Sequence, residues 1–209
     1  MLNDSLSSAE NRRVGSVHIG NLILAVFLAS LGCTLDLWTK HWAFSSLGMP
    51  AYDNIHWIID GFFGFETSIN TGALFGIGKG GVAIFAAISG LATLGIFIWL
   101  TVGGASHDRW LSVTLGLILG GVLGNLYDRM GLWGHQGVRD FILFRYKSFT
   151  WPNFNIADML LICGAAMMMW HAFRMEAVAK GEAKAAEAAQ KIASESDPLD
   201  GADRVSNTA

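Results

Sequence analysis

The chain has 209 residues, of which 52% are hydrophobic and only 15% are charged, and its net charge is −3. Soluble domains carry about 25% charged residues, so this composition argues against a soluble globular protein. No basic patch with interleaved aromatic residues indicates a nucleic-acid partner. The two cysteines, Cys33 and Cys163, lie inside apolar runs and are too few for a disulfide framework or a metal site.

Charged residues are distributed unevenly, since four long stretches hold no Asp, Glu, Lys or Arg. A run of ~20 apolar residues is what a helix needs to cross the hydrocarbon core of a bilayer. Buried helices of a soluble bundle would keep a polar face, and these stretches have none. The sequence therefore predicts four transmembrane helices, near residues 16–36, 81–102, 110–128 and 157–173.

The first apolar stretch also has features of a signal peptide, because Arg12 and Arg13 precede it. It ends in Ser30-Leu31-Gly32-Cys33, which approaches a lipoprotein cleavage box. That box requires Leu where Ser30 stands and a small residue where Leu31 stands, and the run is long for a signal segment. We predict a retained first span.

The predicted organisation is a cytoplasmic arm (residues 1–15), a four-helix membrane domain (16–175) and a cytoplasmic tail (176–209). The tail is rich in Ala, Glu and Lys up to Ala193, which favours a helix, and its polar end favours disorder. The positive-inside rule favours cytoplasmic termini through Arg12, Arg13, Arg109, Arg174, Lys180 and Lys184. Basic residues on the other side weaken this bias, but the two long connections share one face in either orientation.

Four aspartates, Asp36, Asp128, Asp140 and Asp158, are expected at that shared face. A charged side chain at the centre of a membrane helix costs about 2.5–3.5 kcal/mol, but the cost falls near a helix end. Purely structural roles are therefore open for three of them. Asp36 has the spacing for an interfacial ion pair with Lys40, Asp128 is adjacent to Arg129, and Asp158 would suit the positive end of a helix dipole.

The spacing around the third span indicates more than isolated ion pairs. Gly120 and Gly124 place small residues four apart, which permits close helix approach. Asn125 and Asp128 follow on or beside the same stripe, so both should face protein rather than lipid. Asn155 precedes Asp158 by three residues at the start of the last span. The pattern predicts a polar site set in an apolar wall.

The residue types limit the chemistry of such a site. The six His are scattered, without the HExxH pattern of a zinc helix, and no Walker loop or Ser/Cys–His arrangement is recognisable. We therefore expect neither a metal nor a cofactor. Two neighbouring carboxylates can catalyse hydrolysis without either, because like charges at short range share one proton.

Five segments, in order, resemble motifs of the lipoprotein signal peptidase (signal peptidase II) family, over roughly residues 20–175. They are Asp36-Leu37-Trp38-Thr39-Lys40 (DxxTK), Asn70-Thr71-Gly72-Ala73-Leu74-Phe75 (NxGAxF), the run GGVLGNLYDR from Gly120 to Arg129, Val138-Arg139-Asp140-Phe141 (VxDF) and Phe154-Asn155-Ile156-Ala157-Asp158 (FNxAD). Arg139 departs from the pattern, since the family more often has an apolar residue there, and the stretch from Arg129 to Asp140 is a few residues longer than usual.

The resemblance implies a membrane aspartic endopeptidase with Asp140 and Asp158 as its catalytic dyad. Supporting or substrate-binding roles are implied for Asn70, Gly72, Asn125, Asp128, Arg129 and Asn155, and structural roles for Asp36 and Lys40. The implied substrate is a prolipoprotein cut just before its diacylglyceryl-modified Cys, with membrane lipids around it.

The expected fold is an all-α membrane protein of four transmembrane helices, with an extracytoplasmic region after the first helix that has room for a small β element. The expected location is the bacterial cytoplasmic (inner) membrane, with both termini cytoplasmic and the active site extracytoplasmic. Two alternatives remain: a small channel or transporter, and an assembly subunit whose aspartates only hold helices together.

Overall fold

The computed structural model describes residues 17–51, 54–72 and 80–195. The chain divides into two compact units, residues 1–168 and 169–209. The predicted N-terminal arm, residues 73–75 of the second motif and the end of the tail lie outside the described residues.

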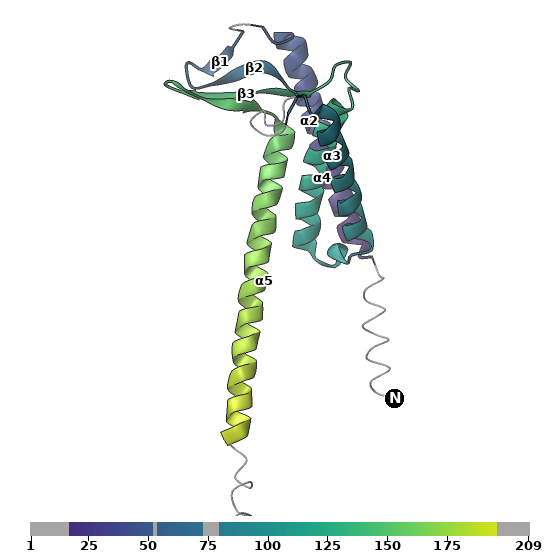
Figure 1. Cartoon of the computed structure of the whole chain (residues 1–209), viewed down its shortest axis with the longest axis vertical. Coiled ribbons are helices and arrows are strands. Elements are labelled where there is room, and N and C mark those ends of the chain that lie inside the picture. Colours follow the sequence, from purple (N-terminus) through teal and green to yellow (C-terminus); the bar gives the residue numbers. More distant parts are fainter. Residues whose placement is uncertain (1–16, 52–53, 73–79, 196–209) are drawn as a thin grey trace, which may run out of the picture. The chain divides into compact units, whose positions relative to one another are not determined.

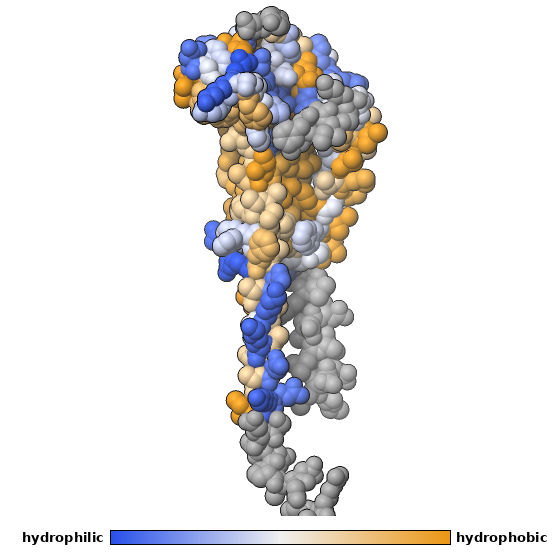
Figure 2. Space-filling view, turned by 60° about the vertical axis from the view of Figure 1, so that its left-hand side comes forward, coloured by the Kyte–Doolittle hydropathy of each residue, from blue (hydrophilic) through white to orange (hydrophobic). Residues whose placement is uncertain are grey.

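In the part of the chain that the structure describes, four helices are long and apolar enough to cross a membrane, as the sequence predicts. They are α2 (Ile19–Leu47), α3 (Val82–Thr101), α4 (Arg109–Arg129) and α5 (Ile156–Glu195), and a short 3₁₀ helix, η2 (Ala105–His107), joins α3 to α4. Hydrophobic side chains form a broad surface over the helices, next to a more hydrophilic end (Figure 2). Ile84 and Leu91 of α3 are 65% and 70% exposed, and hydrophobic side chains exposed on such a helix suit contact with lipid.

The predicted end of the first helix is wrong. The expected boundary lay near residue 36, whereas α2 continues to Leu47. Asp36 and Lys40 do not end the helix, because both side chains are fully buried and paired within the protein. A charged residue marks the end of a membrane helix only when it has to reach water.

Glycines allow α2 and α4 to approach closely, as the spacing of small residues predicts. A Cβ on Gly116 would lie 2.8 Å from the Ala25 carbonyl oxygen, and one on Gly120 would lie 3.0 Å from that of Ala29. The neighbouring Gly121 faces the start of α5 at Ala157. Backbone contact of this kind takes the place of hydrophobic packing between helices in lipid.

Gly116→Ala should destabilise the protein by about 1–3 kcal/mol, because the added methyl group meets backbone atoms that have no room to move. The measurement is thermal unfolding in detergent. Gly90→Ala is the matched control, since it lies in α3 and an added Cβ meets nothing within 4 Å. Equal losses of stability in the two variants would contradict this account of the α2–α4 contact.

A four-stranded antiparallel sheet lies at one end of the bundle formed by α2, α3 and α4 (Figure 1). Its strands, in the order β1-β2-β3-β4, are β1 (His56–Ile59), β2 (Phe63–Asn70), β3 (Val138–Tyr146) and β4 (Phe149–Phe154). The β element expected after the first helix is therefore present, but half of the sheet comes from the connection between α4 and α5. Pairing of Ser68 with Asp140 joins the two connections.

Residues 169–195 belong to the second unit and continue α5 as a helix, which agrees with the Ala/Glu/Lys composition. From Arg174 to Ile192 its side chains are exposed. Lys180 pairs with Glu176 at 2.6 Å, one helical turn away. The domain limits at residues 15 and 175 stay a prediction.

Candidate active site

The four aspartates come from four elements that meet where the sheet joins the helices. Asp36 lies on α2, Asp128 in the last turn of α4, Asp140 on β3 and Asp158 in the first turn of α5. Asp36 and Asp128 are fully buried, and Asp140 is 2% exposed. Buried charges are costly unless they are paired, so the partners of each carboxylate decide what it can do.

Asp36 and Asp128 belong to a buried ion network centred on Lys40. The Lys40 Nζ lies 2.7 Å from Asp36 Oδ2 and 3.2 Å from Asp128 Oδ2. Arg139 completes the network through its Nη2, which donates to Asp128 Oδ1 at 2.7 Å. The predicted Asp36–Lys40 pair is present, and both side chains are fully buried in the protein.

The sequence interpretation gave Asp128 a structural ion pair with Arg129, and this choice of partner is wrong. Asp128 is bonded by Arg139 and Lys40, whereas Arg129 lines a cavity beside Asp158 and interacts electrostatically with Asp158 and Asp140 more than with Asp128. Sequence reasoning treated Arg139 only as a departure from the family pattern. Its position one residue before a predicted site carboxylate was the available signal.

Two asparagines connect the ion network to Asp140 and Asp158. Lys40 Nζ donates to Asn125 Oδ1 at 2.9 Å, and the amide of Asn125 then donates to Asp158 Oδ1, also at 2.9 Å. Asn155 Nδ2 donates to Asp140 Oδ1 at 2.6 Å and to Asn125 Oδ1 at 3.2 Å. Since an ammonium group can only donate, Lys40 fixes which end of the Asn125 amide faces Asp158.

Asp158 and Asn155 also form the N-terminal cap of α5. The Asp158 backbone N–H donates to Asn155 Oδ1 at 3.0 Å, and the Asn155 N–H donates to Asp158 Oδ2 at 3.3 Å. This is the reciprocal arrangement of a capping box. Asp158 thus has the structural role at the start of the helix that the sequence allowed. Its Oδ2 serves this cap, while its Oδ1 accepts from Asn125.

The environment of Asp140 favours its protonated form. The pKa of Asp140 is raised to about 8, mainly by burial and then by the negative charge of Asp158. The positive charge of Lys40 and hydrogen bonds from Asn155 and Asn70 oppose these effects. At neutral pH Asp140 therefore holds a proton beside a second carboxylate.

Asn70 and Gly72 stand at the end of β2, next to Asp140. Asn70 hydrogen-bonds Asp140, and its Oδ1 accepts from the Gly72 backbone N–H at 2.9 Å. The turn therefore holds the Asn70 side chain in place.

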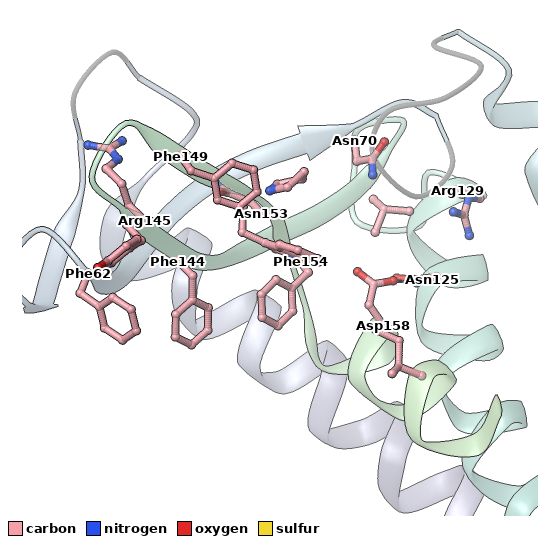
Figure 3. A pocket seen from close by; sticks show the side chains of 15 residues that line it. Phe62, Asn70, Asn125, Arg129, Phe144, Arg145, Phe149, Asn153, Phe154 and Asp158 are labelled. Atoms are coloured by element: carbon pink, nitrogen blue, oxygen red, sulfur yellow. Dashed lines mark hydrogen bonds between the residues drawn. The ribbon is translucent and has the colours of Figure 1, made fainter. Parts of the chain in front are cut away.

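A cavity of about 490 Å³ opens beside this cluster. Asn70, Asn125, Arg129 and Asp158 line it, while Asp140 lies behind them, bonded to Asn155. Figure 3 shows Phe62, Phe144 and Phe154 along one wall, with Asp158 and Asn125 beyond the last ring. The ring centroids are 5.7 Å apart for Phe62–Phe144 and 6.1 Å for Phe144–Phe154. The site joins a carboxylate pair to an apolar groove.

Among the residues that the structure describes, no group of three or more His, Cys, Asp or Glu side chains is placed to hold a metal ion. The polar end of the cavity offers the Asp158 carboxylate, the amides of Asn70 and Asn125 and the Arg129 guanidinium. This set of groups can hydrogen-bond a peptide and transfer protons to and from it.

Residues 28–174 match the family model described as signal peptidase (SPase) II. The chain belongs to this family. It is 45% identical over 165 residues to the lipoprotein signal peptidase of Rhodopirellula baltica, covering 75% of this chain and 74% of that one. It is 35% identical over 154 residues to the one of Symbiobacterium thermophilum, covering 74% and 97%.

The fold is also similar to solved structures of bacterial membrane enzymes obtained by the in meso method. One has a TM-score of 0.64 at 25% identity, covering 77% of this chain and 92% of that chain, and a second has a TM-score of 0.61. The signal peptidase II chain is therefore a multi-pass membrane protease. The prediction of a peptidase is confirmed over the alternatives of a channel or an assembly subunit.

Proposed function

We propose that the chain is an aspartic endopeptidase that removes the signal peptide from diacylglyceryl-modified prolipoproteins, cutting just before the lipidated Cys. The observation that carries the proposal is the asparagine bridge: Asn155 donates to Asp140 through its side chain and to Asp158 through its backbone. The bridge holds two carboxylates of unequal exposure together at the polar end of an apolar groove.

The two carboxylates divide the work according to their surroundings. Asp158 lines the cavity and is the ionised member, which takes a proton from the attacking water. Asp140, protonated because it is buried, donates its proton to the scissile carbonyl oxygen as the water oxygen bonds to the carbon. Breakdown of this tetrahedral intermediate breaks the C–N bond, and the amine leaves with the proton that Asp158 took from the water. As the carbonyl bond re-forms, one hydroxyl group of the intermediate returns a proton to Asp140, so both carboxyl groups regain their starting states. The pH dependence belongs to the pair as a whole.

The residues around the pair have supporting roles in this mechanism. Arg129 supplies a positive charge near both carboxylates, and Asn70 holds Asp140. Asn125 and Asn155 orient the carboxyl groups, and Gly72 fixes Asn70 through its backbone. Asp128 supports the site from the buried network, and Asp36 and Lys40 are structural residues of that network.

The groove suits a lipid-bearing substrate. Its wall of phenylalanines offers apolar contact next to the hydrophilic groups that would bind the peptide backbone. Membrane lipids would surround the apolar helices. We place the enzyme in the bacterial cytoplasmic (inner) membrane, with both termini cytoplasmic and the carboxylate pair at the extracytoplasmic face, in accord with the charge bias.

Cleavage of matched precursor peptides tests the substrate assignment. The purified enzyme in detergent should cut a precursor with a diacylglyceryl-modified Cys at least about 100-fold faster than the same peptide with a free thiol, because only the first fills the groove. The product, identified by mass spectrometry, should begin with the lipidated Cys. Equal rates for the two peptides would contradict the substrate assignment and leave the protease assignment intact.

A further inference from the structure

Arg139 is the charged side chain whose place in the site neither the motif pattern nor the proposed mechanism explains. It precedes Asp140 on β3, so the two side chains point to opposite faces of the strand. Its side chain is 6% exposed, and three of its nitrogens bind Asp128: Nη2 at 2.7 Å and Nε at 3.1 Å to Oδ1, and the backbone N at 3.0 Å to Oδ2. Three bonds to one carboxylate clamp β3 to the end of α4.

The same residue is held from two further sides. Its guanidinium lies over the Trp133 ring, 5.0 Å from the centroid, and the Trp133 Nε1 donates to the Gly137 carbonyl at 3.2 Å. Its own carbonyl accepts from Asn155 Nδ2 at 3.3 Å, and that amide also binds Asp140. Arg139 therefore connects the loop before β3 to the asparagine that joins both carboxylates.

Arg139 also balances the charge of the buried network. The buried network beside Asp140 holds two cations, Lys40 and Arg139, and two anions, Asp36 and Asp128. Without Arg139 this network would carry a net negative charge next to a carboxylate pair that is already coupled. A negative charge in a buried environment acts strongly on neighbouring carboxyl groups.

Resting on the proposed dyad, we infer that Arg139 is a positioning residue for catalysis: it holds the strand that carries Asp140 and balances the buried charge behind that carboxylate. Among the described residues, the other charged or titratable groups that face this region are Cys33, Asp36 and Lys40 of α2, Tyr127, Asp128 and Arg129 of α4, and Asp158 of α5. Glu66 of β2 is bonded by Asn153, and His41 and His135 line a separate cavity with Arg139.

The test compares pH profiles of cleavage for Arg139→Met, Asp128→Asn and the double variant, with Arg174→Met as the matched control on an exposed part of α5. Arg139→Met makes the network negative, so the alkaline limb should move up by roughly half to one pH unit, and kcat should fall about 10- to 100-fold with little change in KM. Asp128→Asn makes the network positive, so its limb should move down. The double variant restores the balance and should return close to the wild-type profile.

A purely structural role predicts a different result. In that case each variant would lose activity equally at every pH, in proportion to its loss of folded protein in detergent, and the double variant would be the worst of the three. That result would overturn the inference. Arg139→Lys keeps the charge and loses part of the clamp, so it should lower kcat without moving the limb; a moved limb would also contradict the charge argument.

Failure of this inference is distinguishable from failure of the proposed function. If Asp140→Asn and Asp158→Asn are inactive while Arg139→Met keeps the wild-type pH profile, the dyad stands and only the role of Arg139 is wrong. If either dyad variant cleaves at the wild-type rate, the proposed function itself is wrong.

Discussion

Asp140→Asn and Asp158→Asn should each reduce cleavage of a lipidated precursor by about 10³- to 10⁴-fold, because each removes one of the two proton-transfer groups. Asn keeps the shape of Asp, and in Asp140→Asn its oxygen can still accept from Asn155. In Asp158→Asn one oxygen replaces two acceptors, so the bond from Asn125 or the bond from the Asn155 N–H is lost while the other can remain. The measurement is the initial rate in detergent with a matched amount of folded enzyme.

The stability of the Asp140→Asn variant provides the control for folding. Asp140 has a pKa of about 8 in the folded protein, above its ordinary value of about 3.9. Its protonated form therefore contributes stability that is complete at low pH and is lost as pH rises toward 8. Asn cannot ionise, so the Tm of the variant should fall less than that of the wild type between pH 5 and about 9. A variant that loses cleavage by unfolding would instead show a lower Tm at every pH.

Lys40→Met should destabilise the protein by about 3–5 kcal/mol, since it leaves two fully buried carboxylates without their shared cation. It also removes the group that orients Asn125 toward Asp158. We expect a large fall in Tm in detergent and a low yield of membrane protein. Asp36→Asn should lower the yield less, because Lys40 keeps Asp128 and Asn125 as partners.

Two comparisons isolate the effect of burial in the Lys40→Met variant. Lys180→Met also breaks an ion pair one helical turn apart, but its side chain is 72% exposed, so the free energy of unfolding should change by less than about 0.5 kcal/mol. The double variant Lys40→Met/Asp36→Asn removes one charge of each sign and should be more stable than Lys40→Met alone. A double variant that is less stable would show that packing, and not unpaired charge, dominates at this position.

Much of the architecture follows from local features of the sequence. Long uncharged stretches predict four spans because the hydrocarbon core of a bilayer accepts little else. The order of those spans places both long connections on one face, and the five motif segments indicate the family and the dyad candidates. Small residues at Gly120 and Gly124 predict a close helix contact, and α4 does pack against α2 and α5 through such glycines.

Partners that are distant in sequence were decided only by the tertiary structure. The sequence suggested Arg129 for Asp128 because the two are adjacent, whereas the fold brings Arg139 and Lys40 to that carboxylate. The end of α2 could not be read from Asp36, because whether a charge must reach water depends on what the other helices bring to it. The strands after α4 were missed because β3 is stabilised by pairing with β2, a contact between separate connections.

The four aspartates also show which features follow from the sequence and which depend on the tertiary structure. Composition and span order by themselves determined that Asp36, Asp128, Asp140 and Asp158 share one face of the membrane. The motif resemblance singled out Asp140 and Asp158, but only the tertiary structure showed what distinguishes the two pairs. Asp36 and Asp128 lie in a buried, charge-balanced network with Lys40 and Arg139, whereas Asp140 and Asp158 interact with each other beside a groove. The physical reason is that the state of a carboxyl group depends on its burial and on nearby charges, and both come from elements far apart in the chain.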